Sequence, residues 1–244
     1  MPNKYLLQCQ KYIREHKRPL FDFHMHTSWT DGAQSPEEMY DQAVFQGLRY
    51  ILFSEHARQS SVSWFFNFAK TIRSLPKSPC IAMLGVESKI LDFDGNLDIT
   101  KSIVEMCDIV VASVHRFPGE TGRIEGHGNI NIKDVSEIEF QLSWAALENP
   151  DVDVLGHPFG MTYRRFQQIP DKNKIRALIK KASQSNKAFE INARYHPEPK
   201  QLIKMCLKEG TIISLSSDAH NVQDVGRICR ILAGEEKPWN PYEF

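Results

Sequence analysis

Seven short apolar runs, separated by stretches long enough for helices, constrain the fold of this 244-residue chain more than any other feature. The runs are rich in Val, Ile, Leu and Phe and are bounded by polar residues, as in strands buried on both faces. The predicted strands are Leu20–His24, Tyr50–Ser54, Cys80–Val86, Ile109–Val114, Val152–Leu155, Ala188–Asn192 and Thr211–Ser216. Seven β-α units predict a closed or nearly closed parallel barrel, with a doubly wound open sheet as the alternative.

Helix signals fall between most of these runs. The segment Ser35–Glu38 opens one helix, because its serine suits the N-cap, its proline the first helical position and its last glutamate position N3. Further helices are predicted over Val135–Leu147, Asp171–Gln184 and Lys200–Lys208, the last ending at Gly210. The alternation of strands and helices therefore continues along most of the chain.

The chain is expected to form a single domain over residues 20–244, preceded by a helical extension over residues 1–19. No internal linker, low-complexity tract or repeat of fixed period is present. The extension is predicted to pack outside the barrel, because its apolar residues recur at helical spacing: Tyr5, Leu6, Cys9, Tyr12 and Ile13. The longest irregular stretch, Arg116–Asn131, contains several glycines and charges, and loops of this length are often lids.

Composition excludes some classes of protein and leaves others open. Hydrophobic residues make up 41% of the chain, enough for a sizeable core. Lys+Arg and Asp+Glu both number 30, so the balanced charge argues against a general nucleic-acid coat or a membrane-surface protein. The five cysteines have no C-x-x-C spacing and are interpreted as buried free thiols. Without a signal-like or membrane-length apolar run, the protein is expected to be cytoplasmic.

Histidines and carboxylates stand at the ends of six predicted strands. The first strand runs into Asp22, His24 and His26, which share one face, and Asp31 follows in the next loop. The other strand-end residues are His56, Glu87, His115, His157, Asp218 and His220. In a barrel, the carboxyl ends of the strands open onto one face, so these side chains are expected to converge there.

A lone strand-end histidine is more often a capping or hydrogen-bonding group than a ligand, but six such strand ends favour one shared site. Imidazole and carboxylate groups suit zinc, iron or manganese. No cysteine stands at any of these ends, which argues against a structural zinc site. The residues therefore predict a metal-dependent hydrolase.

The order His-x-His, Asp, His, Glu, His, His, Asp-x-His resembles the polymerase-and-histidinol-phosphatase (PHP) superfamily, from about Phe21 to Arg227. The stretches that carry the resemblance are FHMHTSWTDG, GVESKILDFDGNLD, VVASVHR, DVLGHP, FEINAR and SSDAH. They are most similar to the PHP domain of bacterial X-family DNA polymerases and to stand-alone PHP phosphatases. The resemblance implies a distorted (β/α)7 TIM-like barrel with a site for three divalent metal ions, of zinc, manganese or iron.

The resemblance also implies how the nine ligands divide among three ions. The first ion is assigned to His24, His26, Glu87 and Asp218. Glu87 would bridge to a second ion with His115 and His157, and the third is assigned to Asp31, His56 and His220. The family usually has Thr-Asp-His where this chain has Ser54-Glu55-His56, so the residues that support His56 are expected to differ.

The charge of such a site favours a phosphate ester as its substrate. Three divalent ions bring six positive charges and the ligands Asp31, Glu87 and Asp218 bring three negative ones, which leaves about three positive charges. A metal pair can generate hydroxide and hold a phosphoryl group for in-line attack. Glu87, Asp218 and His220 are the expected catalytic residues. The general acid stays open among a metal-bound water, Asp218 and His220.

Cations near the ligands are candidates for substrate binding, with surface cations at the barrel rim as the alternative. The predicted substrate-binding residues are Arg58, Lys89, Arg116 and Arg194. The weaker candidates on loops are Arg123, His127, Arg164 and Arg165. His16 and His196 are interpreted as surface residues.

Three functions are compatible with this sequence. The first is a phosphomonoesterase acting on a small phosphorylated metabolite, as a histidinol phosphatase does. The second is a nuclease such as a 3′–5′ exonuclease, for which Trp64–Phe68 is a candidate base-stacking platform, although a helix packed on the barrel or on a partner subunit is favoured. The third is a non-catalytic metal-binding module, which the complete ligand series disfavours. The exposed aromatics expected at Trp64 and Phe66 suggest a homo-oligomer.

Overall fold

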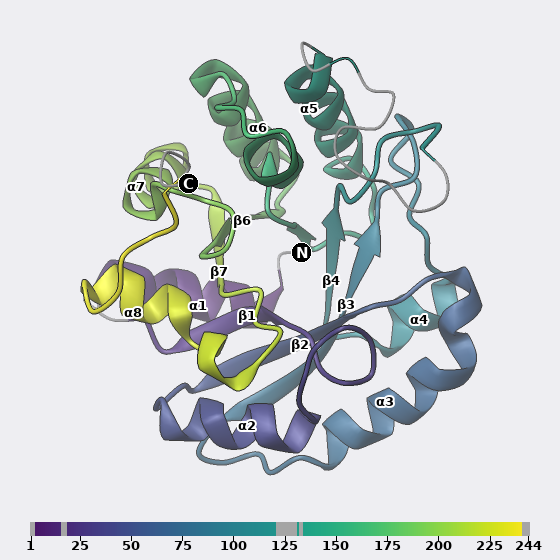
Figure 1. The fold of residues 1–244 in the computed structure, drawn as a ribbon, viewed down its shortest axis with the longest axis vertical. Coiled ribbons are helices and arrows are strands. Elements are labelled where there is room, and N and C mark those ends of the chain that lie inside the picture. Colours follow the sequence, from purple (N-terminus) through teal and green to yellow (C-terminus); the bar gives the residue numbers. More distant parts are fainter. Residues whose placement is uncertain (1–2, 16–18, 121–130, 132–133, 241–244) are drawn as a thin grey trace.

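The computed structural model describes residues 3–15, 19–120, 131 and 134–240, and its strands form one parallel sheet in the order β1 to β7 (Figure 1). The strands are β1 (Phe21–Met25), β2 (Tyr50–His56), β3 (Ile81–Lys89), β4 (Ile109–Ser113), β5 (Val154–Leu155), β6 (Ala188–Asn192) and β7 (Ile212–Ser216). Each predicted strand is present, but β2 and β3 extend past the predicted ends at Ser54 and Val86.

Helices surround the strands on the outside (Figure 1). They are α1 (Lys4–Glu15), α2 (Pro36–Phe45), α3 (Val62–Ser74), α4 (Lys101–Met106), α5 (Val135–Ala146), α6 (Lys172–Gln184), α7 (Pro199–Glu209) and α8 (Arg227–Ala233). Shorter helical turns cover Gln59–Ser61, Met161–Arg165 and Val222–Asp224. Strands and helices alternate along the chain, as the sequence predicts.

Contacts between the first and last strands close the sheet. Met25 pairs with Ala219 in a parallel bridge beyond the end of β7. The His26 N–H donates to the Ala219 carbonyl at 2.8 Å, and the Ala219 N–H donates to the His24 carbonyl at 3.3 Å. The fold is therefore a nearly closed (β/α)7 barrel, which confirms the predicted fold class and excludes the open sheet.

Local sequence signals account for the ends of several helices. Ser35 and Glu38 form a capping box at the start of α2, and Pro36 occupies its first turn. The side chain of Asp171 accepts a hydrogen bond from the Asn173 N–H at the start of α6. These features place α2 and α6 where the sequence predicts helices.

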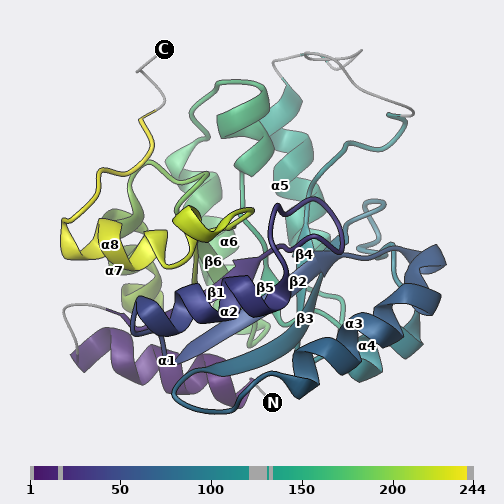
Figure 2. The same cartoon turned by 60° about the horizontal axis from the view of Figure 1, so that its bottom comes forward.

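Helix α1 lies across the amino-terminal ends of the strands rather than along the barrel wall (Figure 2). Leu6 and Cys9 are buried in the core. The Gln10 side chain donates to the Thr211 carbonyl at 3.1 Å and accepts from the Ile213 N–H at 3.0 Å. The helix is thus outside the ring of strands, as predicted, and it closes one end of it.

The stretch Trp64–Phe68 belongs to α3, which confirms the helical interpretation. Phe65 and Phe68 are buried, and Trp64 is half-buried and stacks on Trp29 with ring centroids 6.1 Å apart. The expectation that Trp64 is exposed was therefore wrong, because Trp29 covers its ring. Phe66 is exposed as expected.

All five cysteines are free thiols, and all except the half-buried Cys107 are buried. Burial raises the pKa of the Cys80 thiol to about 12. Among the described residues, no helix has both the length and the apolar character that a membrane span requires.

Candidate metal centre

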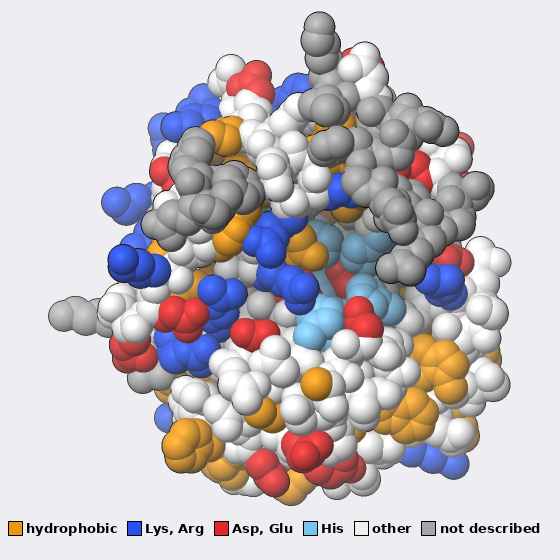
Figure 3. Space-filling view, viewed as in Figure 1, with side chains coloured by type: hydrophobic (Ala, Val, Ile, Leu, Met, Phe, Trp, Pro, Cys, Tyr) orange, Lys and Arg blue, Asp and Glu red, His pale blue; other side chains and the backbone are white. Residues whose placement is uncertain are grey.

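Side chains from six strand ends and one loop converge at the carboxyl-terminal end of the barrel. Figure 3 shows the histidines gathered at the centre of this face, with basic side chains next to them. Each of the nine predicted ligands has a nitrogen or oxygen atom within 4.0 Å of another member, and the nine are His24, His26, Asp31, His56, Glu87, His115, His157, Asp218 and His220. The barrel therefore brings together the nine histidine and carboxylate side chains that the sequence singled out as ligands.

The two oxygens of Glu87 face different groups of histidines. Oε1 lies 3.0 Å from His115 Nε2 and 2.8 Å from His157 Nε2. Oε2 lies within 3.5 Å of ring nitrogens of three other histidines, namely His24, His26 and His56. Glu87 is 2% exposed, so its charge is compensated by these rings and not by water. This carboxylate is at the centre of the cluster and can face two cations at once.

A second carboxylate, Asp31, lies at the solvent-facing side of the cluster. Its Oδ2 is 3.3 Å from His220 Nε2 and 3.4 Å from His56 Nε2, and its Oδ1 is 3.8 Å from His26 Nδ1. The loop that carries Asp31 folds tightly against β1, because a Cβ at Gly32 would lie 2.5 Å from the His26 carbonyl oxygen. Glycine is needed at this position for the carboxylate to reach the histidines.

Asp218 completes the cluster from the segment after β7. Its Oδ1 lies 3.3 Å from His26 Nε2 and 3.9 Å from His24 Nε2. Its backbone has a positive φ of 52°, which is unusual for a residue with a side chain and turns the carboxylate toward β1. Asp218 and His220 thus reach the cluster from the strand that closes the barrel.

Buried nitrogen atoms without hydrogen-bond partners mark this cluster as a place for cations. Among the described residues these atoms include His24 Nε2 and both ring nitrogens of His26. A buried polar atom without a partner costs about 1–3 kcal/mol, so such a group of them calls for a ligand. Imidazole and carboxylate donors fit zinc, manganese or iron.

The electrostatics of the protein alone also favour positive charge here. Burial disfavours the charged form of Glu87, but the charges of His115, His24 and His56 outweigh it and hold its pKa well below the usual range. Burial opposes protonation of His56, but the charge of Glu87 and the hydrogen bond to Asp31 raise its pKa to about 10. Protons on these rings occupy the places that metal ions can take.

The structure divides into three groups of residues that could each hold an ion. They are His26, Asp31, His56 and His220; His24, His26 and Glu87; and His56, Glu87 and His115. The ligand atoms within each group lie within 4.8 Å of one another. The first group contains the three residues expected at the third ion, together with His26. The second contains the residues expected at the first ion, without Asp218. The third group contains His56 where the expectation has His157.

Glu190 was missed by the sequence reasoning, although it holds two members of the cluster. This buried residue of β6 lies with its Oε1 2.7 Å from His24 Nδ1, and its Oε2 accepts a hydrogen bond from the His157 N–H. Because the carboxylate can only accept, His24 must donate from Nδ1, which leaves Nε2 as the ring nitrogen directed into the cluster. A carboxylate in the middle of the apolar strand Ala188–Asn192 was the available signal.

Glu55, at the position where the family pattern departs, supports the loop that carries Asp31. Its Oε1 accepts from the Thr27 N–H at 2.7 Å and from Thr27 Oγ1 at 2.5 Å, and its Oε2 accepts from Thr30 Oγ1. Burial raises the pKa of Glu55 to about 7, partly offset by these hydrogen bonds. Glu55, which is longer than the aspartate usual in the family, therefore supports the segment after β1. The difference that was expected next to His56 also affects the loop that carries Asp31.

His196 lies in the core, so its interpretation as a surface residue was wrong. The ring is 1% exposed, its Nδ1 accepts from the Asn192 N–H at 2.9 Å, and its Nε2 lies 2.9 Å from the Pro158 carbonyl oxygen. Nε2 therefore carries the proton, and the ring ties the segment after β6 to the segment after β5. Its neighbour Tyr195 stacks on His157, with ring centroids 4.4 Å apart.

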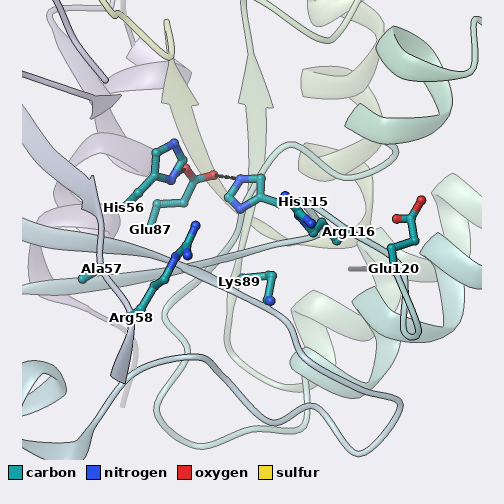
Figure 4. A pocket seen from close by; sticks show the side chains of 8 residues that line it. All are labelled: His56, Ala57, Arg58, Glu87, Lys89, His115, Arg116 and Glu120. Carbon is teal, nitrogen blue, oxygen red and sulfur yellow. Dashed lines mark hydrogen bonds and ion pairs between the residues drawn. The ribbon is translucent and has the colours of Figure 1, made fainter. Parts of the chain in front are cut away.

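Three of the four predicted substrate-binding cations line one pocket beside the cluster. The pocket has a volume of about 580 Å³ and is lined by His56, Ala57, Arg58, Glu87, Lys89, His115, Arg116 and Glu120 (Figure 4). Arg194 lies elsewhere: its Nη1 is 2.9 Å from His220 Nδ1, and its Nε is 4.0 Å from Asp218 Oδ2. The cations therefore approach the cluster from two sides.

The weaker sequence candidates are engaged in structural contacts or cannot be placed. Arg165 donates to Glu120 at 2.7 and 3.1 Å, and Arg164 lies over the ring of Trp239. Both belong to a short helical turn and not to an irregular loop. Arg123, His127 and His16 lie outside the described residues, as does most of the predicted lid.

Comparisons with known proteins agree with this geometry. The family model described as "PHP domain" matches residues 22–239. A "Probable phosphatase" of Caldicellulosiruptor saccharolyticus is 29% identical over 84% of this chain and 81% of its own length. "DNA polymerase/3'-5' exonuclease PolX" of Bacillus subtilis is 25% identical over 89% of this chain, which spans 37% of that protein.

Among solved structures, the fold resembles histidinol phosphate phosphatase from Lactococcus lactis, which was crystallised with zinc, L-histidinol and phosphate. The TM-score is 0.65 and the identity 19%, over 90% of this chain and 93% of that one. At this identity, the likeness supports the barrel fold.

Proposed function

This chain belongs to the PHP domain family, and from that premise we propose that it is a metal-dependent phosphomonoesterase that hydrolyses a small phosphorylated metabolite. The observation that carries the proposal is the carboxylate of Glu87, whose two oxygens face separate sets of histidines. A carboxylate in this position can bridge two ions, as expected for a multinuclear hydrolytic site. The relatives named phosphatases support the same conclusion.

We propose that nine side chains hold three divalent ions of zinc, manganese or iron. His24, His26, Glu87 and Asp218 would hold the first, Glu87, His115 and His157 the second, and Asp31, His56 and His220 the third. The distance of 2.8 Å from His157 Nε2 to Glu87 Oε1 supports a place for His157 beside His115. Such ions activate water for attack on phosphorus and polarise the phosphoryl oxygens.

The residues around the ligands would set the proton positions of the imidazoles. Glu190 accepts from His24 Nδ1 and therefore leaves Nε2 as the nitrogen that can face an ion. His220 Nδ1 lies 2.9 Å from the Asp218 carbonyl oxygen, so donation to this carbonyl leaves His220 Nε2 to face Asp31 and an ion. The protein thus orients these two rings so that Nε2 of each faces the cluster.

Arg194 is the side chain proposed to bind the phosphoryl group that is transferred. When His220 Nδ1 donates to the Asp218 carbonyl, it cannot also accept from Arg194 Nη1, which lies 2.9 Å away. The guanidinium then needs another acceptor beside Asp218 and His220, and a phosphoryl oxygen provides one. Of the two side chains that the sequence left open, His220 is the candidate for protonating the leaving group. The reason is that the burial of Asp218 is outweighed by the hydrogen bond to His26 and the charge of His24, which hold its pKa below the usual range.

A nuclease is the second candidate, because the relative PolX carries 3′–5′ exonuclease in its name. The aromatic stretch in α3 gives it little support, since Phe65 and Phe68 are buried and cannot stack on bases. The pocket of about 580 Å³ is of the size that small-molecule sites have, which favours a small metabolite.

Assays of the purified protein with zinc or manganese distinguish these functions. The substrates are a panel of phosphate monoesters, a phosphodiester dye and end-labelled single-stranded DNA. Hydrolysis of monoesters without shortening of the DNA is expected, and the reverse pattern would favour the nuclease. Metal analysis should find more than one ion per chain, and His24→Ala should abolish activity while the circular dichroism spectrum stays unchanged.

A further inference from the structure

We propose that the pocket beside the metal centre binds a second anionic group of the substrate, so that the leaving group carries a carboxylate or a second phosphate. This inference rests on the proposed phosphomonoesterase function and narrows its substrate class. It starts from the position of the pocket: His56, Glu87 and His115 belong to both the cluster and the pocket wall. A substrate with its phosphoryl group at the cluster can therefore extend its remaining atoms into the pocket.

Three cations line this pocket from different elements of the fold. Arg58 follows β2, Lys89 ends β3, and Arg116 follows β4. Figure 4 shows both Arg58 and Lys89 lining the pocket, with the Arg58 guanidinium extending toward His56 and Glu87. The three cations therefore line one pocket from the ends of three neighbouring strands.

The two carboxylates of the pocket do not neutralise Arg58 or Lys89. Glu87 is enclosed by the histidines of the cluster. Glu120 accepts two hydrogen bonds from Arg165, at 2.7 and 3.1 Å, and one from the Phe117 N–H at 2.7 Å. Arg165 does not line the pocket, so it compensates Glu120 from outside. Arg58 and Lys89 therefore keep positive charge that is available to a ligand.

Lys89 is held only loosely by the protein. Its Nζ lies 3.9 Å from Asp98 Oδ2, beyond hydrogen-bond distance, and the side chain is 33% exposed. Arg58 is fixed at its backbone, where its N–H donates to Ser61 Oγ at 2.9 Å. Both side chains can therefore adjust to an anion while the backbone of each residue stays in place.

The charge of the pocket disfavours a cationic leaving group. An amine in this space would approach three cations, whereas a carboxylate or phosphate would gain charge-assisted hydrogen bonds. A hydrogen bond to a charged group corresponds to a change in affinity of about 10- to 100-fold. The preferred substrate is thus a phosphate monoester with a second anion and not one whose leaving group is an amino alcohol.

Binding of four phosphonates that differ only in their tail tests the proposal without catalysis. Calorimetry with the zinc-loaded protein compares propylphosphonate, 3-phosphonopropionate, propane-1,3-bisphosphonate and 3-aminopropylphosphonate. We expect one or both of the anionic tails to increase affinity by about 10- to 100-fold over the propyl tail, and the amino tail to decrease it. The stronger of the two anionic ligands identifies carboxylate or phosphate as the second group. Equal affinities, or tightest binding of the amino compound, would overturn the proposal.

Variants then assign the effect to the pocket. Arg58→Ala and Lys89→Ala should each reduce the preference for the anionic tails by about tenfold or more, and Arg58→Lys should restore part of it. Arg176→Ala, at an exposed arginine of α6, is the matched control and should keep the full preference. An unchanged preference in Arg58→Ala and Lys89→Ala, with the thermal unfolding of both intact, would contradict the assignment.

The kinetics of glycerol 3-phosphate and 3-phosphoglycerate separate this inference from the function on which it rests. Turnover of both esters with equal kcat/KM would overturn the second anion site and leave the phosphomonoesterase function standing. Absence of turnover for all monoesters would overturn the function, while the calorimetric preference would still report on the pocket. Preference for 3-phosphoglycerate that falls in Arg58→Ala supports both.

Discussion

The two ends of the barrel are built from the same seven strands, but their buried polar groups differ in whether they find hydrogen-bond partners. At the amino-terminal end, α1 covers the strands, and Gln10 pairs with the backbone of Thr211 and Ile213. At the carboxyl-terminal end, His24 and His26 are equally buried, yet ring nitrogens of both lack partners among the described residues. At the amino-terminal end the side chain of Gln10 finds its partners within the chain, whereas at the carboxyl-terminal end the ring nitrogens need ligands.

Because of this difference, we expect the amino-terminal end to contribute mainly to stability and the carboxyl-terminal end mainly to chemistry. Removing side chains from the amino-terminal end, the closed end under α1, should weaken the fold and leave the site intact. Changing the open end should alter metal binding and turnover, because its groups are held at a cost to stability. Variants at the two ends test whether stability and activity change independently.

The largest effect is expected for Glu87→Gln at the open end. The amide cannot bridge two cations and brings one negative charge less, so activity should fall to background and the metal content below that of the unchanged protein. Monoester assays and elemental analysis measure both. Glu105→Gln, at an exposed glutamate of α4, is the matched control. Substantial activity in Glu87→Gln would contradict the central role of this carboxylate.

At the closed end, Leu6→Ala should lower the free energy of unfolding by about 2–5 kcal/mol, because it leaves a cavity under α1. Leu6 is 1% exposed, and its neighbour Leu7 is 44% exposed, so Leu7→Ala provides the control with a small effect. Denaturant unfolding measures the loss. If Leu6→Ala also changed kcat of the folded protein, the two ends would be coupled.

An intermediate effect is expected for Glu190→Gln, behind the open end. The amide no longer fixes His24 as a donor from Nδ1, so zinc affinity should fall by about 10- to 100-fold while the site still binds metal. Competition with a chromophoric chelator measures the affinity, with Glu105→Gln again as the control. Unaltered affinity would show that Glu190 only fills the core.

The smallest effect is the change in metal affinity expected for a shift of one pH unit. In the metal-free protein the pKa of His56 is raised to about 10, since the charge of Glu87 and the hydrogen bond to Asp31 outweigh its burial. At neutral pH this ring is protonated, and the proton must leave before an ion can bind. Zinc affinity should therefore rise with pH between 6 and 8, by about tenfold per unit for each proton released. Chelator competition at several pH values would contradict this if the affinity stayed constant.

The sequence predicted the strands and the convergence of the nine histidine and carboxylate side chains well, because these residues stand where buried strands end. His24, His115 and His157 each follow an apolar run, and in a parallel barrel that position alone brings them to one face. The confirmed fold class depends on the same alternation of apolar and helical segments.

What the sequence could not predict depends on contacts between distant segments. Glu190 lies within an apolar strand, and only the barrel geometry brings it to His24 and to the backbone of His157. His196 follows a strand among polar residues and resembled a surface residue, but its two nitrogens meet Asn192 and Pro158. Spacing indicates the face on which a side chain lies, but it does not identify the partner that the side chain meets there.

The seam between β1 and the segment after β7 gives bound metal a further consequence. Two backbone hydrogen bonds join His26 and His24 to Ala219, and the same segments carry Asp218 and His220. An ion shared by His24 and Asp218 would link the beginning of the barrel to its end, as a cross-link closing a very long loop. Such a link restricts the unfolded chain most when the residues that it joins are far apart in sequence. Metal supply in the cell would then control how long the folded protein survives as well as how fast it works.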